Sequence, residues 1–401
     1  MKCIVKIGFL FCLIFGSFYS HSQDKVKFGY FNKNHKIEIK KTPEKDTIIP
    51  KENNLFFKTP KSNDTINIAV LLPFYTKLND TLVKNWSIEE KDINQIYFKS
   101  KLSLKLLEGI LLATDSLSNR GICVRLSVFD TENNKNVVNK LLHSDTLNSV
   151  NIIFGPLYSS NFKVVSQFFK FDKKKTFINP LSSHVDLLRR NPNVYSLTPA
   201  DKIIRDSISS FVIRKRDKKN IVIFSLANES KNSDYIKLKI NKQLIPVNYK
   251  MFSSLKDITS ESLSAELNSD TSIVIIPSNN KSLVTKIIAL LGTIDNSMTV
   301  IGMESWSSFN ELNTETLMKL NVHLPSTYNL ELKENVKLQR KFEKIYSHKM
   351  DKFSIISYQS IIHFCSTDSH FNFKNFVKGN GFVNTNIQFL YYSNFKLMSV
   401  N

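Results

Sequence analysis

The sequence lacks the signatures that most enzyme classes require. It contains no Gly-x-Ser-x-Gly turn of a serine hydrolase, no Walker-type glycine-rich loop followed by Lys-Ser/Thr, and no Gly-x-Gly-x-x-Gly after a strand. A motif-spaced pair of carboxylates for acid–base chemistry is also missing. We therefore expect a binding protein, not an enzyme, and no cofactor.

Cysteine is scarce as well. The chain has 4 cysteines, and no Cys-x-x-Cys or His-x-x-x-His spacing indicates a metal site. Cys3 and Cys12 lie in an N-terminal segment that we expect to be removed, which leaves Cys123 and Cys365. These two would pair in an oxidising compartment, but two buried small hydrophobic residues are the favoured interpretation.

The N-terminus has the pattern of a secretory signal. Lys2 gives a basic start, residues 4–18 form a short apolar core interrupted only by Lys6, and Ser20-His21-Ser22 supplies the small residues that a signal peptidase reads. No cysteine follows small residues as a lipoprotein signal demands. We predict that residues 1–22 are a signal peptide, and that the protein is periplasmic, without a lipid anchor or a transmembrane segment after cleavage.

Residues 23–63 carry too little apolar surface to form a core. They are rich in Lys, Asn and Thr and contain Pro43, Pro50 and Pro60 without a sustained hydrophobic period. We predict a disordered linker.

The formal net charge is +20, which at face value indicates an anionic partner. Lys is spread through the chain together with Asn, Ile and Phe, and we find no basic patch in the sequence. We therefore interpret the charge as compositional and predict no nucleic-acid partner. Only a general attraction to acidic envelope polymers remains.

Beyond residue 63, apolar strands alternate with amphipathic helices. The predicted strands are 66–74, 124–129, 152–154, 176–178, 220–225, 247–251, 272–277 and 298–302. Leucines at helical spacing over 102–117 predict a helix that ends at Asn119-Arg120-Gly121, where glycine suits the C-terminal cap. This alternation predicts a mostly parallel sheet with helices on both faces, and its restart after Thr198 predicts a second copy.

The stretch Ile152–Asn161 is the clearest ligand-facing corner. An apolar strand stops at Gly155-Pro156, and Ser159 or Ser160 is placed to cap the following helix. Helix starts favour carboxylates and phosphates because their first N–H groups lack intrahelical partners. The residues predicted on the buried side of this helix are Val164, Val165, Phe168 and Phe169.

The order of these elements resembles the type 1 periplasmic-binding fold, the Leu/Ile/Val-binding branch of the ABC transporter substrate-binding proteins. The matching stretches are Leu71-Leu72-Pro73, residues 108–115 with Asn119-Arg120-Gly121, Asp130, residues 153–156 with Ser159-Ser160, residues 179–183 and residues 198–201. Tyr358 stands at the place of a family Tyr-Asp-Ala motif, but Gln359-Ser360 follows it here. Residues 378–382 and 386–389 resemble the closing hairpin of the family.

The resemblance implies two doubly wound parallel-sheet lobes hinged by crossing segments. Lobe I would comprise residues 64–198, with 328–376 returning to it. Lobe II would comprise residues 199–327, with 377–401 as its closing hairpin. The crossings are expected near Thr198-Pro199, near Thr327-Tyr328 and before Gly379.

The resemblance also implies a ligand site in the crevice between the lobes, outside the carboxyl ends of the strands. The lobe I candidates, whose family equivalents hold the carboxylate and amino group of an amino acid, are Tyr158, Ser159, Ser160, Leu181, Ser182 and Ser183. The lobe II candidates are Asn228, Glu229, Ser278, Asn279, Glu304 and Trp306. Glu304 would pair with an ammonium group and Trp306 would stack on the ligand. An equal alternative is that the lobe II residues are solvated loop residues, and that Trp306 is a packing residue.

Two functions follow. One is a periplasmic receptor that captures an amino-acid-like or carboxylate ligand for an ABC permease. The other is a ligand-independent scaffold or activator for the cell-wall synthesis machinery, a role that some relatives of this fold have. Residues 23–63 show no LysM peptidoglycan-binding pattern, which weakens direct wall binding.

Overall fold

The computed structural model describes residues 65–84, 96–217, 219–267, 271–328 and 333–400. These residues form two compact units. Of the described residues, those up to Thr198 and those in Lys337–Thr385 form the first unit, and those in Pro199–Val336 and from Asn386 to residue 400 form the second. No helix in these ranges is both long and apolar enough to cross a membrane.

The first unit is built on a seven-stranded sheet. In spatial order its strands are β11 (Phe373–Lys374), β12 (Phe382–Asn384), β5 (Val194–Ser196), β4 (Thr176–Asn179), β3 (Ile152–Phe154), β1 (Ile66–Leu72) and β2 (Val124–Asp130). All neighbouring pairs are parallel except β11 with β12. β1 and β3 are almost wholly buried because helices cover both faces of the sheet, which explains their continuous apolar sequences.

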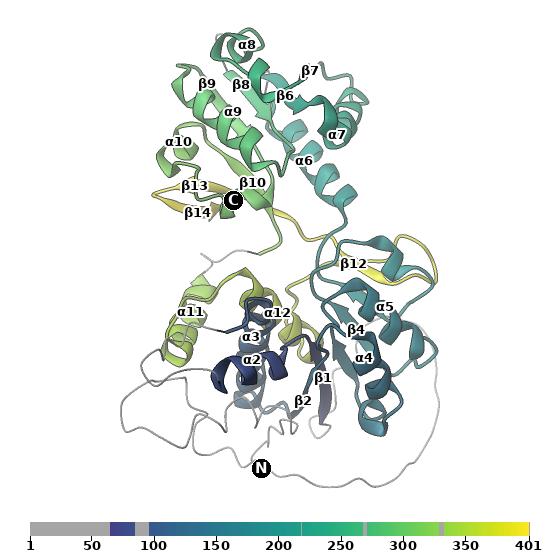
Figure 1. Cartoon of the computed structure of the whole chain (residues 1–401). Helices are drawn as coiled ribbons and strands as arrows, with labels where there is room; N and C mark the ends of the chain where they lie inside the picture. Colours follow the sequence, from purple (N-terminus) through teal and green to yellow (C-terminus); the bar gives the residue numbers. More distant parts are fainter. Residues whose placement is uncertain (1–64, 85–95, 218, 268–270, 329–332, 401) are drawn as a thin grey trace. The chain divides into compact units, whose positions relative to one another are not determined.

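Helices cover both faces of this sheet. They are α2 (Thr76–Lys84), α3 (Ser100–Asn119), α4 (Lys135–Leu142), α5 (Ser159–Phe168), α11 (Lys333–Tyr346) and α12 (Lys352–Cys365), with short 3-10 turns at Asp145–Leu147 (η1) and Val185–Leu188 (η2). Figure 1 shows α3 and α12 on one side of the sheet and α4 and α5 on the other. α3 and α12 approach so closely that a Cβ built on Gly109 would lie 2.0 Å from the carbonyl oxygen of Ser354.

The second unit repeats this architecture. Its seven strands, in spatial order, are β14 (Lys396–Ser399), β13 (Gln388–Ser393), β10 (His323–Ser326), β9 (Ser297–Ile301), β8 (Thr271–Ile275), β6 (Asn220–Leu226) and β7 (Asn248–Phe252). The five strands from β7 to β10 are parallel, and β13 and β14 add an antiparallel edge. The order β7-β6-β8-β9-β10 matches β2-β1-β3-β4-β5 of the first sheet, so the predicted second copy is confirmed.

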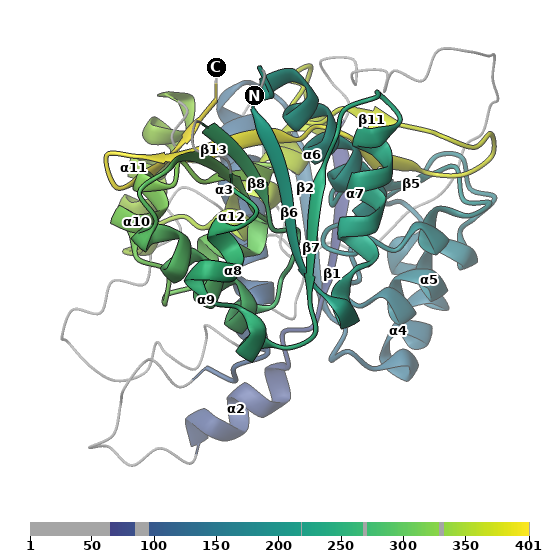
Figure 2. The ribbon, with the colours of Figure 1, turned by 90° about the horizontal axis from the view of Figure 1, so that it is seen from above.

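The second core lies between this sheet and two helical layers. The helices are α6 (Asp201–Lys215), α7 (Lys231–Asn241), α8 (Ser260–Ser264), α9 (Lys281–Thr293) and α10 (Thr314–Lys319), with 3-10 turns at Ala227–Glu229 (η3), Leu255–Asp257 (η4) and Glu304–Ser308 (η5). Figure 2 shows α6 and α7 on one side and α8, α9 and α10 on the other. The central strands β6 and β8 supply much of one continuous buried cluster.

The structure tests the predicted end of the helix at 102–117 and the predicted start of the closing hairpin. The helix predicted at 102–117 is α3, and Gly121 follows its end with a left-handed φ of 80°, as the cap prediction expects. The closing hairpin differs: β12 pairs with β5, so the chain leaves the first unit only after Thr385 and not at residue 377. The signal peptide and linker predictions lie outside the described residues.

Cys365 is a buried free thiol, so it does not form a disulfide with Cys123. Burial raises the pKa of the Cys365 thiol to about 12. The favoured interpretation as a small hydrophobic residue therefore holds for Cys365.

Candidate functional site

The first corner of the lobe I candidate site follows β3. Gly155 has a φ of 87°, and a Cβ at this position would lie 2.4 Å from the carbonyl oxygen of Leu71, so the turn requires glycine. α5 begins directly after the turn, with Tyr158 as its N-cap and without a side-chain capping bond. The prediction that Ser159 or Ser160 caps this helix is wrong, because both residues already belong to its first turn.

The buried face of α5 is also narrower than predicted. Val165 and Phe169 are buried, and Val164 is partly buried. Phe168, which we expected on the same side, is 49% exposed. Its ring instead meets the edge of His143 on α4, with the ring centroids 5.4 Å apart.

The second corner follows β4 and is fixed from beneath by Asn179. This side chain is 1% exposed. Its Nδ2 donates to the carbonyl oxygen of Ser182 at 2.8 Å and to Ser196 Oγ at 3.0 Å, and its Oδ1 accepts from the Ser182 N–H at 3.2 Å. The loop that carries Leu181, Ser182 and Ser183 is therefore held in one conformation, with all three residues partly exposed.

A hydrogen bond joins the two corners. Ser159 Oγ donates to Ser182 Oγ across 3.0 Å, and Ser182 Oγ also accepts from the His184 N–H at 3.3 Å. The structure thus brings together the predicted serines from the ends of β3 and β4. Ser160 is exposed beside them on the first turn of α5.

Tyr75 and Tyr97, which the sequence analysis did not single out, lie at the same edge. Tyr75 stands just after β1 with a φ of 52°, and its ring meets Tyr97 edge-on with centroids 5.1 Å apart. Burial raises the pKa of Tyr75 to about 12, and a hydrogen bond with the Tyr158 hydroxyl acts in the same direction. A signal was available in the sequence, because Tyr75 lies two residues after the strand end Leu71-Leu72-Pro73, just as Tyr158 lies two residues after Gly155-Pro156.

Asp130 holds this edge in place through its carboxylate. Its side chain is buried at the end of β2, and its carboxylate accepts backbone N–H groups from Phe74 at 2.9 Å, Thr76 at 2.7 Å and Glu132 at 2.8 Å. Three such bonds to one carboxylate hold the segment after β1 in place. Asp130 therefore fixes the loop that presents Tyr75.

The carboxyl edge of lobe I thus gathers hydroxyl groups, aromatic rings and the start of α5. The hydroxyls come from Tyr75, Tyr158, Ser159, Ser160 and Ser183. Hydroxyls donate and accept, and free N–H groups at a helix start favour negative charge. This set of groups can hydrogen-bond a small polar ligand that carries a carboxylate.

Three of the lobe II candidates, Glu229, Ser278 and Asn279, form side-chain hydrogen bonds with one another or with neighbouring residues. Glu229 Oε2 accepts from Ser278 Oγ at 2.7 Å, and its Oε1 accepts from Asn280 Nδ2 at 2.7 Å. Asn279 Oδ1 accepts from Ser305 Oγ at 2.6 Å. Asn228 is exposed and Glu304 is partly buried.

Trp306 is a packing residue. It is 1% exposed, and its indole Nε1 donates to the carbonyl oxygen of Ser278 at 2.9 Å. Its ring covers Gly302 so closely that a Cβ there would lie 2.5 Å from it. Trp306 therefore fits the alternative prediction of a packing residue. It does not fit the prediction that it stacks on a ligand, because its ring has no exposed face. Within the described ranges, no group of three or more His, Cys, Asp or Glu residues could hold a metal ion.

Two sheets that repeat the same order of five parallel strands, each extended at one edge by strands from the C-terminal part of the chain, define the type 1 periplasmic-binding fold, as the resemblance implied. A Leu complex of an ABC transporter substrate-binding protein from Desulfitobacterium hafniense is 12% identical, with a TM-score of 0.52 over 84% of this chain and 100% of that chain. A branched chain amino acid ABC transporter periplasmic ligand-binding protein from Burkholderia xenovorans is 11% identical, with a TM-score of 0.56 over 84% and 94%.

The same fold occurs in full-length LpoA from Haemophilus influenzae. That structure is 10% identical and has a TM-score of 0.54, and the match covers 85% of this chain but only 60% of LpoA. No known protein family and no curated protein matches the sequence. At these identities the likeness establishes the fold alone.

Proposed function

We propose that this protein is an exported periplasmic binding protein, without enzymatic activity, that captures a small amino-acid-like or carboxylate ligand for an ABC permease. The observation that carries the proposal is the bond between Ser159 and Ser182, which joins two strand-end corners into one polar surface. Tyr75 and Tyr158 extend that surface with hydroxyl donors. We keep the division into hinged lobes with crossings near Thr198 and Thr327 as a prediction, and we place the third crossing after Thr385, where the chain leaves the first unit.

In this proposal a ligand carboxylate lies at the start of α5. The N–H groups of its first turn and the hydroxyls of Ser182 and Ser183 donate to the carboxylate oxygens, and the Ser159 hydroxyl holds Ser182 in place by donating to its Oγ. The neutral tyrosine hydroxyls bond a second polar group, and the ring of Tyr97 packs on the apolar part. Removing one hydroxyl that bonds a charged ligand costs about 1.5–3 kcal/mol, or roughly tenfold to a hundredfold in affinity.

A second candidate function is a ligand-independent scaffold or activator in envelope assembly. The internal bonding of the lobe II candidates favours it, because both carboxylate oxygens of Glu229 already accept hydrogen bonds and Trp306 is buried. LpoA shows that the fold also occurs outside the solute-binding proteins named above.

A thermal-shift screen against amino acids, small carboxylates and wall-derived peptides tests the proposal. A ligand at 100 times its Kd should stabilise the folded protein by about 2.7 kcal/mol. The Ser159→Ala, Ser183→Ala double variant should lose this stabilisation, while Ser149→Ala should keep it. Ser149 is an exposed serine of the same unit just before β3, at the opposite end of that strand.

Three outcomes decide between the functions. Stabilisation that only the double variant loses supports the receptor. Equal stabilisation of all three proteins places the site elsewhere and refutes the role of these serines. The absence of any stabilising ligand favours the scaffold.

A further inference from the structure

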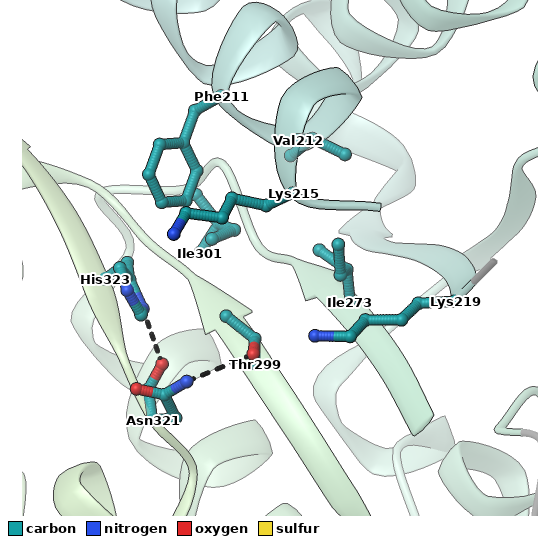
Figure 3. A pocket seen from close by; sticks show the side chains of 9 residues that line it. All are labelled: Phe211, Val212, Lys215, Lys219, Ile273, Thr299, Ile301, Asn321 and His323. Atoms are coloured by element: carbon teal, nitrogen blue, oxygen red, sulfur yellow. Dashed lines mark hydrogen bonds between the residues drawn. The ribbon is translucent and has the colours of Figure 1, made fainter. Parts of the chain in front are cut away.

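The second unit has a small pocket whose lining includes none of the candidates above. Its volume is about 140 Å³, and it lies between the end of α6 and the sheet, against the middle of β8, the second half of β9 and the start of β10 (Figure 3). Phe211 and Ile273 contribute to an apolar wall. The polar lining is Lys215, Lys219, Thr299, Asn321 and His323. The ligand candidates instead follow the carboxyl ends of their strands.

The polar lining is strongly basic. Figure 3 shows Lys215 reaching toward His323 and Lys219 reaching toward Thr299. Neither ammonium group lies within ion-pair distance of a carboxylate among the described residues, although other lysines form such pairs. Two positive charges at one pocket without carboxylates repel each other and favour a bound anion.

The two lining lysines belong to a basic run of the sequence. Residues 214–219 read Arg-Lys-Arg-Asp-Lys-Lys, five basic residues and one acidic residue in six positions. The interpretation that the sequence contains no basic patch therefore needs correction. The sequence alone did not single out this run, because short basic runs are common in a lysine-rich chain. Only the fold shows that Lys215 and Lys219 line a pocket.

Thr299 and Asn321 can donate to a ligand in the pocket, and His323 is held in place beside them. His323 Nδ1 donates to the carbonyl oxygen of Asn321 at 2.8 Å, which fixes the ring. Asn321 Nδ2 donates to Thr299 Oγ1 at 3.1 Å. Because this oxygen accepts from the amide, the Thr299 hydroxyl proton is directed to another acceptor, and the second N–H of the amide can donate as well.

We propose that this pocket binds a phosphate group, either as inorganic phosphate or as the terminal group of a phosphomonoester. Two lysines match its two negative charges, and its tetrahedral oxygens can meet donors from α6, from β9 and from the segment before β10 at the same time. A carboxylate is planar and carries one charge, so it would leave one lysine uncompensated. This site is independent of the function proposed above.

Burial and the charges of Lys215 and Lys219 lower the pKa of His323. A bound phosphate offsets those two charges. The ring resonances of His323 therefore report occupancy of this pocket directly, and they distinguish it from phosphate bound elsewhere on a basic surface.

The test is titration of the whole protein with inorganic phosphate and with glycerol phosphate, followed by histidine ring NMR and calorimetry at constant ionic strength. Chloride is the comparison ion. The variant Lys215→Gln with Lys219→Gln removes both lining charges. The matched control is Arg214→Gln with Arg216→Gln, which removes two exposed charges from the same segment but none from the lining. Thr299→Val removes one donor with little change in volume and without changing the charge.

We expect saturable shifts of His323 with phosphate in the wild type and in the arginine control. The lysine variant should lose about tenfold or more in affinity for each lysine, and Thr299→Val should lose less. Tighter binding of glycerol phosphate than of phosphate would identify a monoester as the preferred source, and the reverse would identify the free ion. An absent His323 shift, an equal shift with chloride, or equal loss in the arginine control would each overturn the proposal.

Discussion

Asp130→Asn tests whether one carboxylate holds the loop that presents Tyr75. Asp130 Oδ1 accepts from Phe74 and Glu132, and Oδ2 accepts from Thr76 at 2.7 Å. In the asparagine variant the side-chain oxygen can still accept from Phe74 and Glu132, but the NH₂ group then takes the place of Oδ2 and faces the Thr76 N–H. One charge-assisted bond is lost and one partly buried N–H loses its acceptor.

The expected loss is about 2–3 kcal/mol of the free energy of unfolding of the first unit, from a hydrogen bond to a charged group. For a unit of this size that corresponds to a fall in Tm of about 5–10 °C. Differential scanning calorimetry measures the fall. Hydrogen exchange followed by mass spectrometry should locate the faster exchange at residues 72–79, with the second unit unchanged.

Asp186→Asn is the matched control, because it makes the same chemical change at an exposed aspartate of the same unit. Its Tm should stay within about 1–2 °C of the wild type, as for most surface substitutions. Equal stability of the Asp130 and Asp186 variants, or unchanged exchange at 72–79, would refute the anchoring role of Asp130. If the proposed ligand site is correct, Asp130→Asn should also weaken ligand binding, because it loosens the loop that carries Tyr75.

The remaining predictions concern acid stability, packing and thiol reactivity. Burial and nearby His370 lower the pKa of His363 from 6.5 to about 4, so in this window the unfolded chain binds a proton that the folded chain does not. The free energy of unfolding should therefore decrease as the pH is lowered through this window. Urea titrations at pH 7 and pH 5 should show a smaller decrease for His363→Phe than for the wild type. An equal decrease in both proteins would contradict the role of His363. Gly302→Ala places a methyl group against the buried Trp306 ring and should destabilise the second unit by about 1–3 kcal/mol, measured by calorimetry, and an unchanged Tm would contradict the packing role. Cys365 should resist alkylation in the native protein and react in denaturant, and rapid native labelling would show that its surroundings open.

The order of strands and helices was predictable because short stretches of sequence determine where each element lies and where it ends. Apolar runs such as Ile66–Leu72 are buried on both faces, so they contain almost no polar residue, and the helix α3 ends where Gly121 supplies the left-handed turn. The position of β12 was not predictable. It joins β5 through backbone hydrogen bonds, which depend little on side-chain identity and place no distinctive residue in the sequence.

The candidate site was predictable only in part. The serines after β3 and β4 stand at strand ends, where chain order already indicates a shared edge. Trp306 was ambiguous, because a tryptophan after a strand suits a ligand or a core equally, and only the contact with Gly302 decides. The phosphate pocket was invisible because Lys219, Thr299 and Asn321 are far apart along the chain and meet only in the folded sheet.

The close packing of α3 on α12 has a consequence for the order of events during synthesis. The first unit cannot complete this helix pair until the segment around Ser354 has left the ribosome, long after Gly109 has emerged. The sheet of the second unit is incomplete until β13 and β14 have been synthesised, and these strands come later in the chain than Ser354. Each unit therefore completes its sheet only after the last of its own strands has emerged, which is β12 for the first unit and β14 for the second.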